Sequence, residues 1–160
     1  MLETAIKDFF SKNEFVDKKF PIFSNNCEDD GCKLVGPFYG CIILNGDNIK
    51  NCLRMHEKSV DRIIVINEVF DKSVDVVLCE LTSGQKRYTD VVEKIKQSGT
   101  CILKILKKLG FEIRKFKCIF VGKYKNAKRV TERPFSIPDS DKHNITIKKL
   151  RCGSNFSQIF

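Results

Sequence analysis

The sequence lacks an apolar run long enough to cross a lipid bilayer. Apolar runs such as Ile63 to Ile66 are far shorter than the roughly 18 to 20 residues that a transmembrane helix needs. The first residues, Met1 to Lys7, include an early acid and no long apolar stretch, so they do not resemble a secretory signal. These absences favour a cytoplasmic protein without a membrane partner.

Internal repeats, low-complexity tracts and linker-like segments are also lacking. A chain of 160 residues with 42% hydrophobic residues can bury roughly two thirds of its unfolded surface in one hydrophobic core. We therefore expect a single domain over residues 1–160 that needs no disulfide scaffold.

Cysteine is present at eight positions, fewer than in small domains built on disulfides. Without a secretory signal, we expect reduced thiols. Three cysteines lie inside apolar segments and are expected to pack in the core, namely Cys79, Cys101 and Cys118. Four others fall in a loop-rich region, and their spacing matches a zinc site poorly: Cys27, Cys32, Cys41 and Cys52. Unremarkable thiols are therefore favoured over zinc at these four positions.

The basic charge is concentrated in one part of the chain. Lys and Arg total 29 against 20 Asp and Glu, a net charge of +9. The segment from Thr82 to Arg129 carries +11 by itself, and the rest of the chain sums to −2. A concentrated basic surface attracts polyanions, most often nucleic acid, although Lys residues that merely cover a solvated helix face would give the same composition.

The hydrophobic pattern predicts an α/β domain. Apolar residues recur at helical spacing near the N-terminus and again over a long central segment, and shorter apolar runs indicate strands between and after them. The expected helices cover 2–10 and 86–109, and the expected strands cover 38–44, 60–66, 74–81, 116–121 and 144–150. A turn is expected at Asn45 to Asp47, and the strands 60–66 and 74–81 are close enough to form a hairpin.

Two carboxylates in this hairpin are candidates for a functional site. Glu80 lies inside the apolar run that ends at Leu81, where a charge is costly to bury unless it is paired or binds a metal. Asp61 opens the neighbouring strand and can face Glu80 across the ladder. Because Mg²⁺ and Mn²⁺ prefer oxygen ligands, the pair predicts a metal site suited to phosphate chemistry.

These segments carry a family resemblance. Val60-Asp61-Arg62-Ile63-Ile64-Val65, then Asp75 to Gly84 with Glu80-Leu81-Thr82, then Asp90 to Ile95 resemble the PD-(D/E)XK nuclease superfamily, over about residues 38–125. The resemblance implies a restriction-endonuclease-like core in the order α-β-β-β-α-β, with a mixed central sheet flanked by helices. It also implies a metal-dependent nuclease in which Asp61, Glu80 and the Leu81 carbonyl hold Mg²⁺ or Mn²⁺.

The chain departs from the superfamily pattern at the lysine of the E-x-K motif, which is Thr82 here. Losing one electrostatic stabiliser commonly costs on the order of a hundredfold in rate. Lys94 lies on the edge of the apolar stripe of the 86–109 helix, from where its long side chain can reach the carboxylates. We expect Lys94 to replace the missing lysine, with a solvated helix-edge lysine as the alternative.

The remaining expectations concern partners. Lys86 and Arg87, which precede the helix, and Lys123 and Lys125, which follow the 116–121 strand, are candidate phosphate contacts. Nucleic acid is the expected partner, with DNA ahead of RNA, and the resemblance allows a homodimer. Two other functions stay open: a catalytically inactive module of the same fold that binds nucleic acid, and a protein-interaction or zinc-organised accessory subunit.

Overall fold

A computed structural model describes residues 2–12, 21–52, 58–67, 71–84, 86–123 and 133–160. In chain order, the elements are α1 (Leu2–Lys12), β1 (Phe23–Ser24), β2 (Cys27–Asp29), β3 (Cys32–Leu34), β4 (Cys41–Asn45), α2 (Gly46–Cys52), β5 (Arg62–Ile66), β6 (Ser73–Thr82), α3 (Tyr88–Lys108), β7 (Glu112–Gly122), β8 (Ile147–Arg151) and the 3₁₀ helix η1 (Phe156–Ile159). None of the helices among these residues is long and apolar enough to span a membrane.

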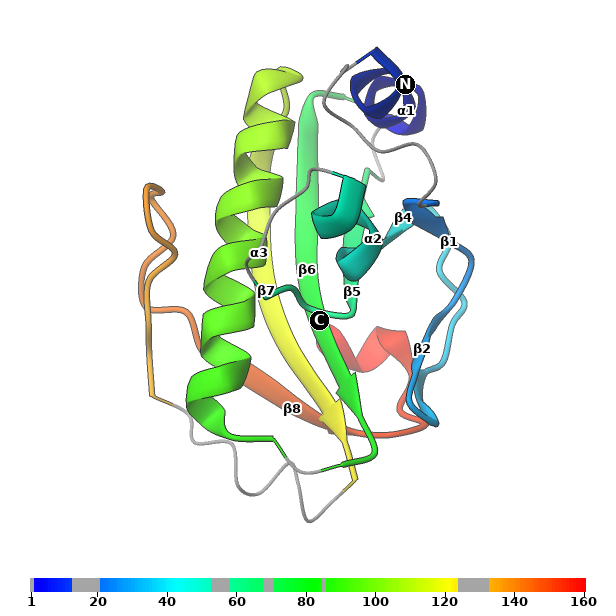
Figure 1. The fold of residues 1–160 in the computed structure, drawn as a ribbon, viewed down its shortest axis with the longest axis vertical. Coiled ribbons are helices and arrows are strands. Elements are labelled where there is room, and N and C mark those ends of the chain that lie inside the picture. Colours follow the sequence, from blue (N-terminus) through cyan, green and yellow to red (C-terminus); the bar gives the residue numbers. More distant parts are fainter. Residues whose placement is uncertain (1, 13–20, 53–57, 68–70, 85, 124–132) are drawn as a thin grey trace.

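A six-stranded mixed sheet is the centre of the fold, in the order β1-β4-β5-β6-β7-β8. In this sheet, neighbouring strands among β1, β4, β5 and β6 pair antiparallel. β7 lies parallel to β6, and β8 lies parallel to β7. The crossover from β6 to β7 runs through α3, which lies along the sheet in Figure 1. The predicted α/β class is confirmed.

The two faces of the sheet are covered differently. Apolar residues of α1, α2 and α3 pack together with one face of the sheet in a single buried cluster. A second cluster on the other face joins the small β2–β3 hairpin and η1 to the sheet. The helices therefore do not flank the sheet on both faces, because a hairpin and one turn of 3₁₀ helix cover the second face (Figure 1).

The two longest predicted elements agree closely with the structure. α3 begins at Tyr88 and ends at Lys108, and it buries the apolar stripe that predicted it, including Val91, Ile95 and Ile102. In β6, every residue from Val74 to Thr82 is buried, because the strand lies in the middle of a covered sheet. The hairpin of β5 and β6 is also confirmed.

The turn predicted at Asn45 to Asp47 is wrong, because Gly46 begins helix α2 there. The Asn45 side chain accepts a hydrogen bond from the backbone N–H of Asn48 at 2.9 Å, which is how an N-cap residue satisfies a free helical N–H. The same Asn-Gly pair that favours a hairpin turn therefore starts a helix.

Strand boundaries shift by a few residues elsewhere. β4 begins at Cys41 because residues 38–40 form the preceding turn, and β5 begins only at Arg62. β7 begins four residues earlier than predicted, at Glu112, and β8 begins at Ile147 rather than at Asn144. The early part of β7 is mostly exposed and charged, because β8 pairs only with Cys118 to Gly122. It therefore lacks the apolar run by which a strand is predicted.

The expectation of reduced thiols is wrong for two cysteines, because Cys32 and Cys152 form a disulfide. Cys79 and Cys118 are buried as predicted, and Cys101 is half-buried against the core. Of the four loop cysteines, Cys32 is therefore unavailable as a zinc ligand. Cys27 is buried with its sulfur 3.8 Å from that of Cys79.

Candidate functional site

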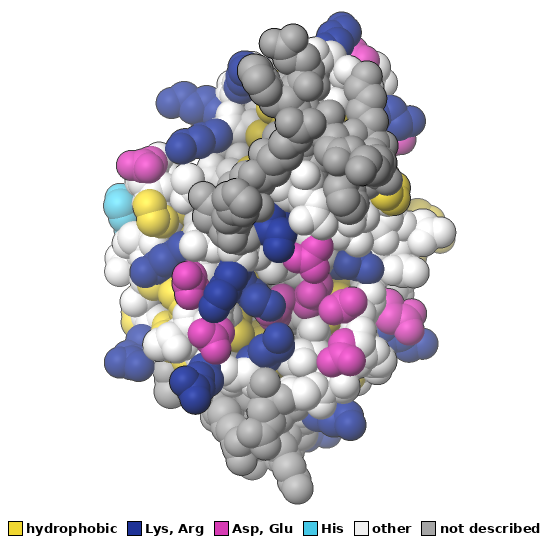
Figure 2. Space-filling view, in the orientation of Figure 1, with side chains coloured by type: hydrophobic (Ala, Val, Ile, Leu, Met, Phe, Trp, Pro, Cys, Tyr) yellow, Lys and Arg dark blue, Asp and Glu magenta, His cyan; other side chains and the backbone are white. Residues whose placement is uncertain are grey.

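The pairing of β5 with β6 places Asp61 opposite Glu80. Arg62 and Cys79 are register partners in this antiparallel pair, so the next residues outward, Asp61 and Glu80, face one another. Glu80 is fully buried and Asp61, immediately before β5, is half-buried. Figure 2 shows Asp and Glu side chains gathered on this face of the molecule beside a group of Lys and Arg side chains.

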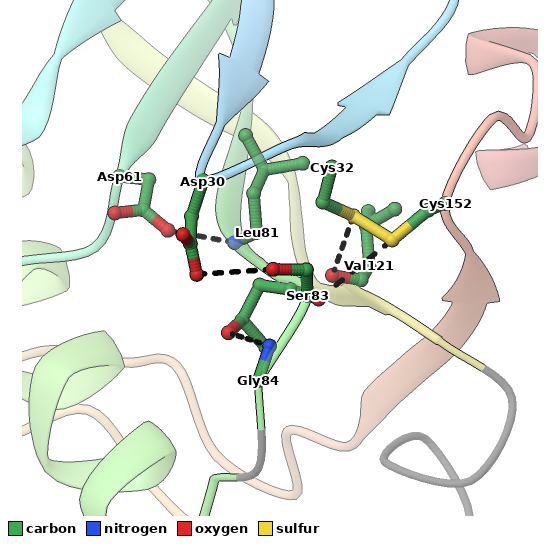
Figure 3. The surroundings of a disulfide bond; sticks show 9 residues. Asp30, Cys32, Asp61, Leu81, Ser83, Gly84, Val121 and Cys152 are labelled. Carbon is green, nitrogen blue, oxygen red and sulfur yellow. Dashed lines mark hydrogen bonds between the residues drawn. A yellow bond between two sulfur atoms is a disulfide. The ribbon is translucent and has the colours of Figure 1, made fainter.

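The side chain and the backbone carbonyl of Asp61 both accept hydrogen bonds from neighbouring elements. Its Oδ2 accepts a hydrogen bond from the backbone N–H of Leu81 at 2.7 Å (Figure 3). Its carbonyl accepts from the backbone N–H of Gly46 at 3.1 Å and from the Arg62 guanidinium at 2.9 Å. Because these donors come from α2, β5 and β6, the position of Asp61 is fixed by three elements.

Helix α3 fixes the chain that leads into Asp61. The Ser98 hydroxyl accepts a hydrogen bond from the backbone N–H of Val60 at 2.9 Å and lies 3.2 Å from the Ser59 hydroxyl. All three residues are buried, so this bond satisfies a backbone donor that has no access to water.

One turn earlier on α3, Lys94 contacts the buried carboxylate. Its Nζ lies 2.7 Å from Glu80 Oε2, and the two side chains are 20% and 0% exposed. Burial acts to lower the pKa of Lys94, but the hydrogen bond and the negative charge of Glu80 outweigh burial and raise it. Lys94 therefore stays charged beside the carboxylates, as its helical position predicted.

The second oxygen of Glu80, Oε1, is buried without a hydrogen-bond partner. A buried carboxylate oxygen left unpaired costs free energy, and a cation is the usual means of compensation. Burial, together with the charge of Glu80, raises the pKa of Asp61 to about 7. Above that pKa, the pair carries negative charge that Lys94 alone does not balance.

Thr82, which replaces the motif lysine, faces the same way along β6 as Glu80 but has a structural role. It is buried, and its hydroxyl accepts a hydrogen bond from the backbone N–H of Gly84 at 3.0 Å. This bond shapes the turn after β6 and brings no charge to the site.

The predicted phosphate contacts lie at two different chain segments near the ends of β6 and β7. Lys86 is half-buried and Arg87 is exposed, both just before α3, and Lys123 is exposed just after β7. Lys125 lies outside the described residues. At the start of α3, the Arg133 guanidinium lies 5.5 Å from the centre of the Tyr88 ring.

Two acidic residues of the β2–β3 hairpin also belong to this neighbourhood and were missed by the sequence interpretation. Asp30 Oδ2 accepts a hydrogen bond from the Ser83 hydroxyl at 3.3 Å. Burial raises the pKa of Asp29, and the charge of Asp61 adds to that effect. The available signal was Asp30-Gly31, since both residues have positive φ, of 51° and 72°, and Asp-Gly favours such two-residue hairpin turns.

No group of three or more His, Cys, Asp or Glu side chains is arranged to hold a metal ion in the part of the chain that the structure describes. An ion at Asp61 and Glu80 would therefore depend on backbone or water oxygens for its other ligands. No protein-family model, curated protein or solved structure matches the chain.

Proposed function

We propose that the protein is a metal-dependent nuclease with a restriction-endonuclease-like core. The observation that carries this proposal is the Glu80 carboxylate, which is fully buried, bonded to Lys94 through one oxygen and unpaired at the other, opposite Asp61. Such a group is costly to a fold and is typical of a site that binds a cation.

The topology supports the same proposal. A helix, α1, precedes three antiparallel strands, β4, β5 and β6, and then α3 leads to the parallel strand β7. This is the order of the superfamily core, with α2 and the β2–β3 hairpin as additions. Asp61 directly precedes β5 and Glu80 lies near the end of β6, where the resemblance expects the metal-binding carboxylates.

The residues present fit a hard divalent cation. Glu80 Oε1 is an unpaired oxygen beside a second carboxylate, and Mg²⁺ and Mn²⁺ bind through one or two carboxylates while keeping several waters. Asp61, Glu80 and the Leu81 carbonyl would hold the ion. When bound, it would polarise a phosphate oxygen and lower the pKa of a bound water.

Lys94 would supply the positive charge that the motif position lacks. Its ammonium group keeps donors beyond the one bonded to Glu80 Oε2. Those donors can orient a water molecule and offset the negative charge that develops on a phosphate. Lys86, Arg87 and Lys123 would hold the flanking phosphates of the nucleic acid.

Cleavage assays with matched variants test the proposal. The full-length protein is incubated with duplex DNA, single-stranded DNA and RNA, in Mn²⁺ and in EDTA. We expect cleavage in Mn²⁺ alone, lowered on the order of a hundredfold or more by Asp61→Asn, Glu80→Gln and Lys94→Met. Glu112→Gln and Lys107→Met are controls with the same chemistry at exposed positions, and they should cleave like the wild type. Cleavage that persists in EDTA or in Glu80→Gln would contradict the proposal.

A nucleic-acid-binding module without catalysis is the second candidate, and two contacts favour it. Lys94 already bonds one oxygen of Glu80, and the Thr82 hydroxyl already accepts a hydrogen bond from the Gly84 N–H. In that case, the wild type and the Glu80→Gln variant would bind nucleic acid equally without metal, and binding would weaken steeply with salt because phosphate contacts release counterions.

A further inference from the structure

A hollow lies where strands β7 and β8 separate. β8 pairs with β7 only from Cys118 to Gly122, so the two segments have no ladder between them before that point. The hollow has a volume of about 560 Å³, within the roughly 300 to 1,000 Å³ that is typical of ligand sites. Its lining includes Lys117, Lys148 and Phe160, and no Asp or Glu of the described residues contributes to it.

Three exposed lysines lie on one face of the sheet at this hollow. Lys117 pairs in register with Val77, and Lys148 pairs with Ile119. Register partners project to the same face of a sheet, and both partners belong to the second buried cluster. These two lysines therefore lie on the face that the β2–β3 hairpin and η1 cover (Figure 1). Lys115 lies two residues before Lys117 on the same strand and shares this face.

The charge of these lysines is not balanced by neighbouring carboxylates. Asp75 is the register partner of Lys115, but it is buried and accepts two hydrogen bonds from the Arg114 guanidinium, at 3.0 Å each. Within the part of the chain that the structure describes, no carboxylate forms an ion pair with any of the three lysines. The hollow therefore attracts anions.

Phe160 presents an aromatic ring beside the lysines. The residue is 54% exposed. Its ring packs edge to face against Phe156, at 81° and with ring centres 5.9 Å apart, and Phe156 in turn contacts Phe38 at 5.0 Å. Because Phe156 is buried, these contacts support the Phe160 ring while a large part of it stays open to solvent. Such a ring suits stacking by a planar base.

The existing contacts of the lysines leave room for a ligand. The Lys115 ammonium group lies 5.8 Å from the centre of the Phe160 ring. A cation–π contact is weak at an exposed site, so a base can replace Lys115 on the ring and leave its ammonium group to contact a phosphate. Lys148 donates one hydrogen bond to the Gln158 carbonyl and keeps further donors.

We propose that this hollow binds single-stranded nucleic acid, with a base stacked on Phe160 and phosphates held by Lys115, Lys117 and Lys148. A nucleotide combines a planar base with an anion, which are the two groups that an exposed ring and lysines recognise. Lys115 and Lys117 lie about 6.4 to 6.8 Å apart along β7, so the charges form a row that suits a chain of phosphates. Bases paired in a duplex cannot reach the ring.

The hollow is separate from the Asp61 and Glu80 site. Lys117 pairs with Val77, three residues before Glu80 on β6, which is about 10 Å along the strand. The Glu80 side chain lies on the opposite face, where it contacts Lys94 of α3. Binding in the hollow therefore does not rest on the proposed function, and it can be measured without metal.

An NMR titration of the ¹⁵N-labelled full chain locates the binding site. The ligand is a single-stranded hexamer of thymidylate, and EDTA is present so that nothing is cleaved. We expect saturable amide shifts at Lys117, Lys148 and Phe160. The proposal is overturned if these three residues show none, whatever shifts occur at Lys86 and Arg87.

Fluorescence anisotropy of the labelled hexamer measures the affinity of matched variants. Phe160→Ala should bind about tenfold more weakly because a stacked base is lost, whereas Phe160→Tyr keeps the ring and should bind like the wild type. Lys117→Met/Lys148→Met should make the slope of log K against log salt less negative by about 1.4, roughly 0.7 for each lost phosphate contact. Lys104→Met/Lys107→Met removes two exposed lysines of α3 and should change neither quantity.

Two further ligands test the chemistry of the site. Thymidine monophosphate should shift the same amides but bind at least tenfold more weakly than the hexamer, and a self-complementary DNA duplex should leave the Phe160 amide unshifted. A mononucleotide that binds as tightly as the hexamer would show a site for free nucleotides and contradict the assignment to single strands. Unchanged binding by Phe160→Ala, or equal losses in the two lysine pairs, would show a general attraction to positive charge and overturn the proposal.

Discussion

At the scale of single residues, the Glu80 and Lys94 pair links stability to the candidate chemistry. Glu80 is fully buried, so removing its partner strands a charge in the core. We expect Lys94→Met to lower the free energy of unfolding by about 3 to 5 kcal/mol. The double variant Glu80→Gln/Lys94→Met should recover most of that loss. Urea unfolding in EDTA at neutral pH measures both.

An exposed group of charged residues provides the control for this comparison of variants. Lys58 lies 3.6 Å from Glu93 and 3.8 Å from Asp90, with all three side chains about half exposed. Lys58→Met should therefore cost no more than about 1 kcal/mol. If Lys94→Met were equally mild, the ion pair would not be a buried one in solution.

The protonation of Asp61 predicts an unusual pH dependence. Burial and the charge of Glu80 raise the folded pKa of Asp61 to about 7, against 3.8 for an aspartate carboxyl in water. The folded state therefore holds a proton that the unfolded state releases between these values. The contribution of Asp61 to stability is fully present below about pH 3.8 and is lost as the pH rises through about 7.

Asp61→Asn isolates this effect, since its side-chain oxygen still accepts from the Leu81 N–H. With metal removed by EDTA, the stability of the wild type relative to the variant should fall as the pH rises from 4.5 to 7.5, by up to about 1.4 kcal/mol per pH unit. Urea unfolding at several pH values measures the difference. A difference independent of pH would show that Asp61 is already ionised in the folded protein at pH 4.5.

At the scale of elements, the contact of α2 with the start of β5 depends on one glycine. A Cβ on Gly46 would lie 1.9 Å from the Val60 carbonyl oxygen, and the Gly46 N–H bonds the Asp61 carbonyl. Gly46→Ala should therefore destabilise the protein by about 1 to 3 kcal/mol, although alanine is the better helix former. Thermal unfolding tests this prediction. Gly84→Ala, where the nearest atom is 3.6 Å away, should be tolerated.

The elements also show which patterns can be read from a sequence. α3 and β6 were predicted closely because each buries a long periodic or continuous apolar run. α2 and the β2–β3 hairpin were missed because they are short and polar. Their turn-forming residues are also ambiguous, since such residues occur both at hairpin turns and at the starts of helices. Asn45-Gly46 caps a helix here, whereas Asp30-Gly31 turns a hairpin.

At the scale of the whole molecule, the candidate site was predictable only where it depends on neighbouring elements. The juxtaposition of Asp61 with Glu80 follows from one hairpin, and Lys94 lies on the helix that comes next along the chain. The β2–β3 hairpin with Asp29 and Asp30 could not be placed, because it is held by the disulfide between residues 120 positions apart and by backbone bonds to the residues that follow Cys152. No local pattern specifies a contact over that distance.

That distance also sets an order of events during synthesis. The hairpin at Cys32 to Val35 docks on residues 152–156, which are translated last among its partners. At about 5 to 20 residues per second, the 120 intervening positions take a ribosome about 6 to 24 s to add. Throughout that interval, the nascent chain carries the acidic turn of the β2–β3 hairpin without the residues that it docks on, so this side of the candidate site is completed only after residue 152 has been added.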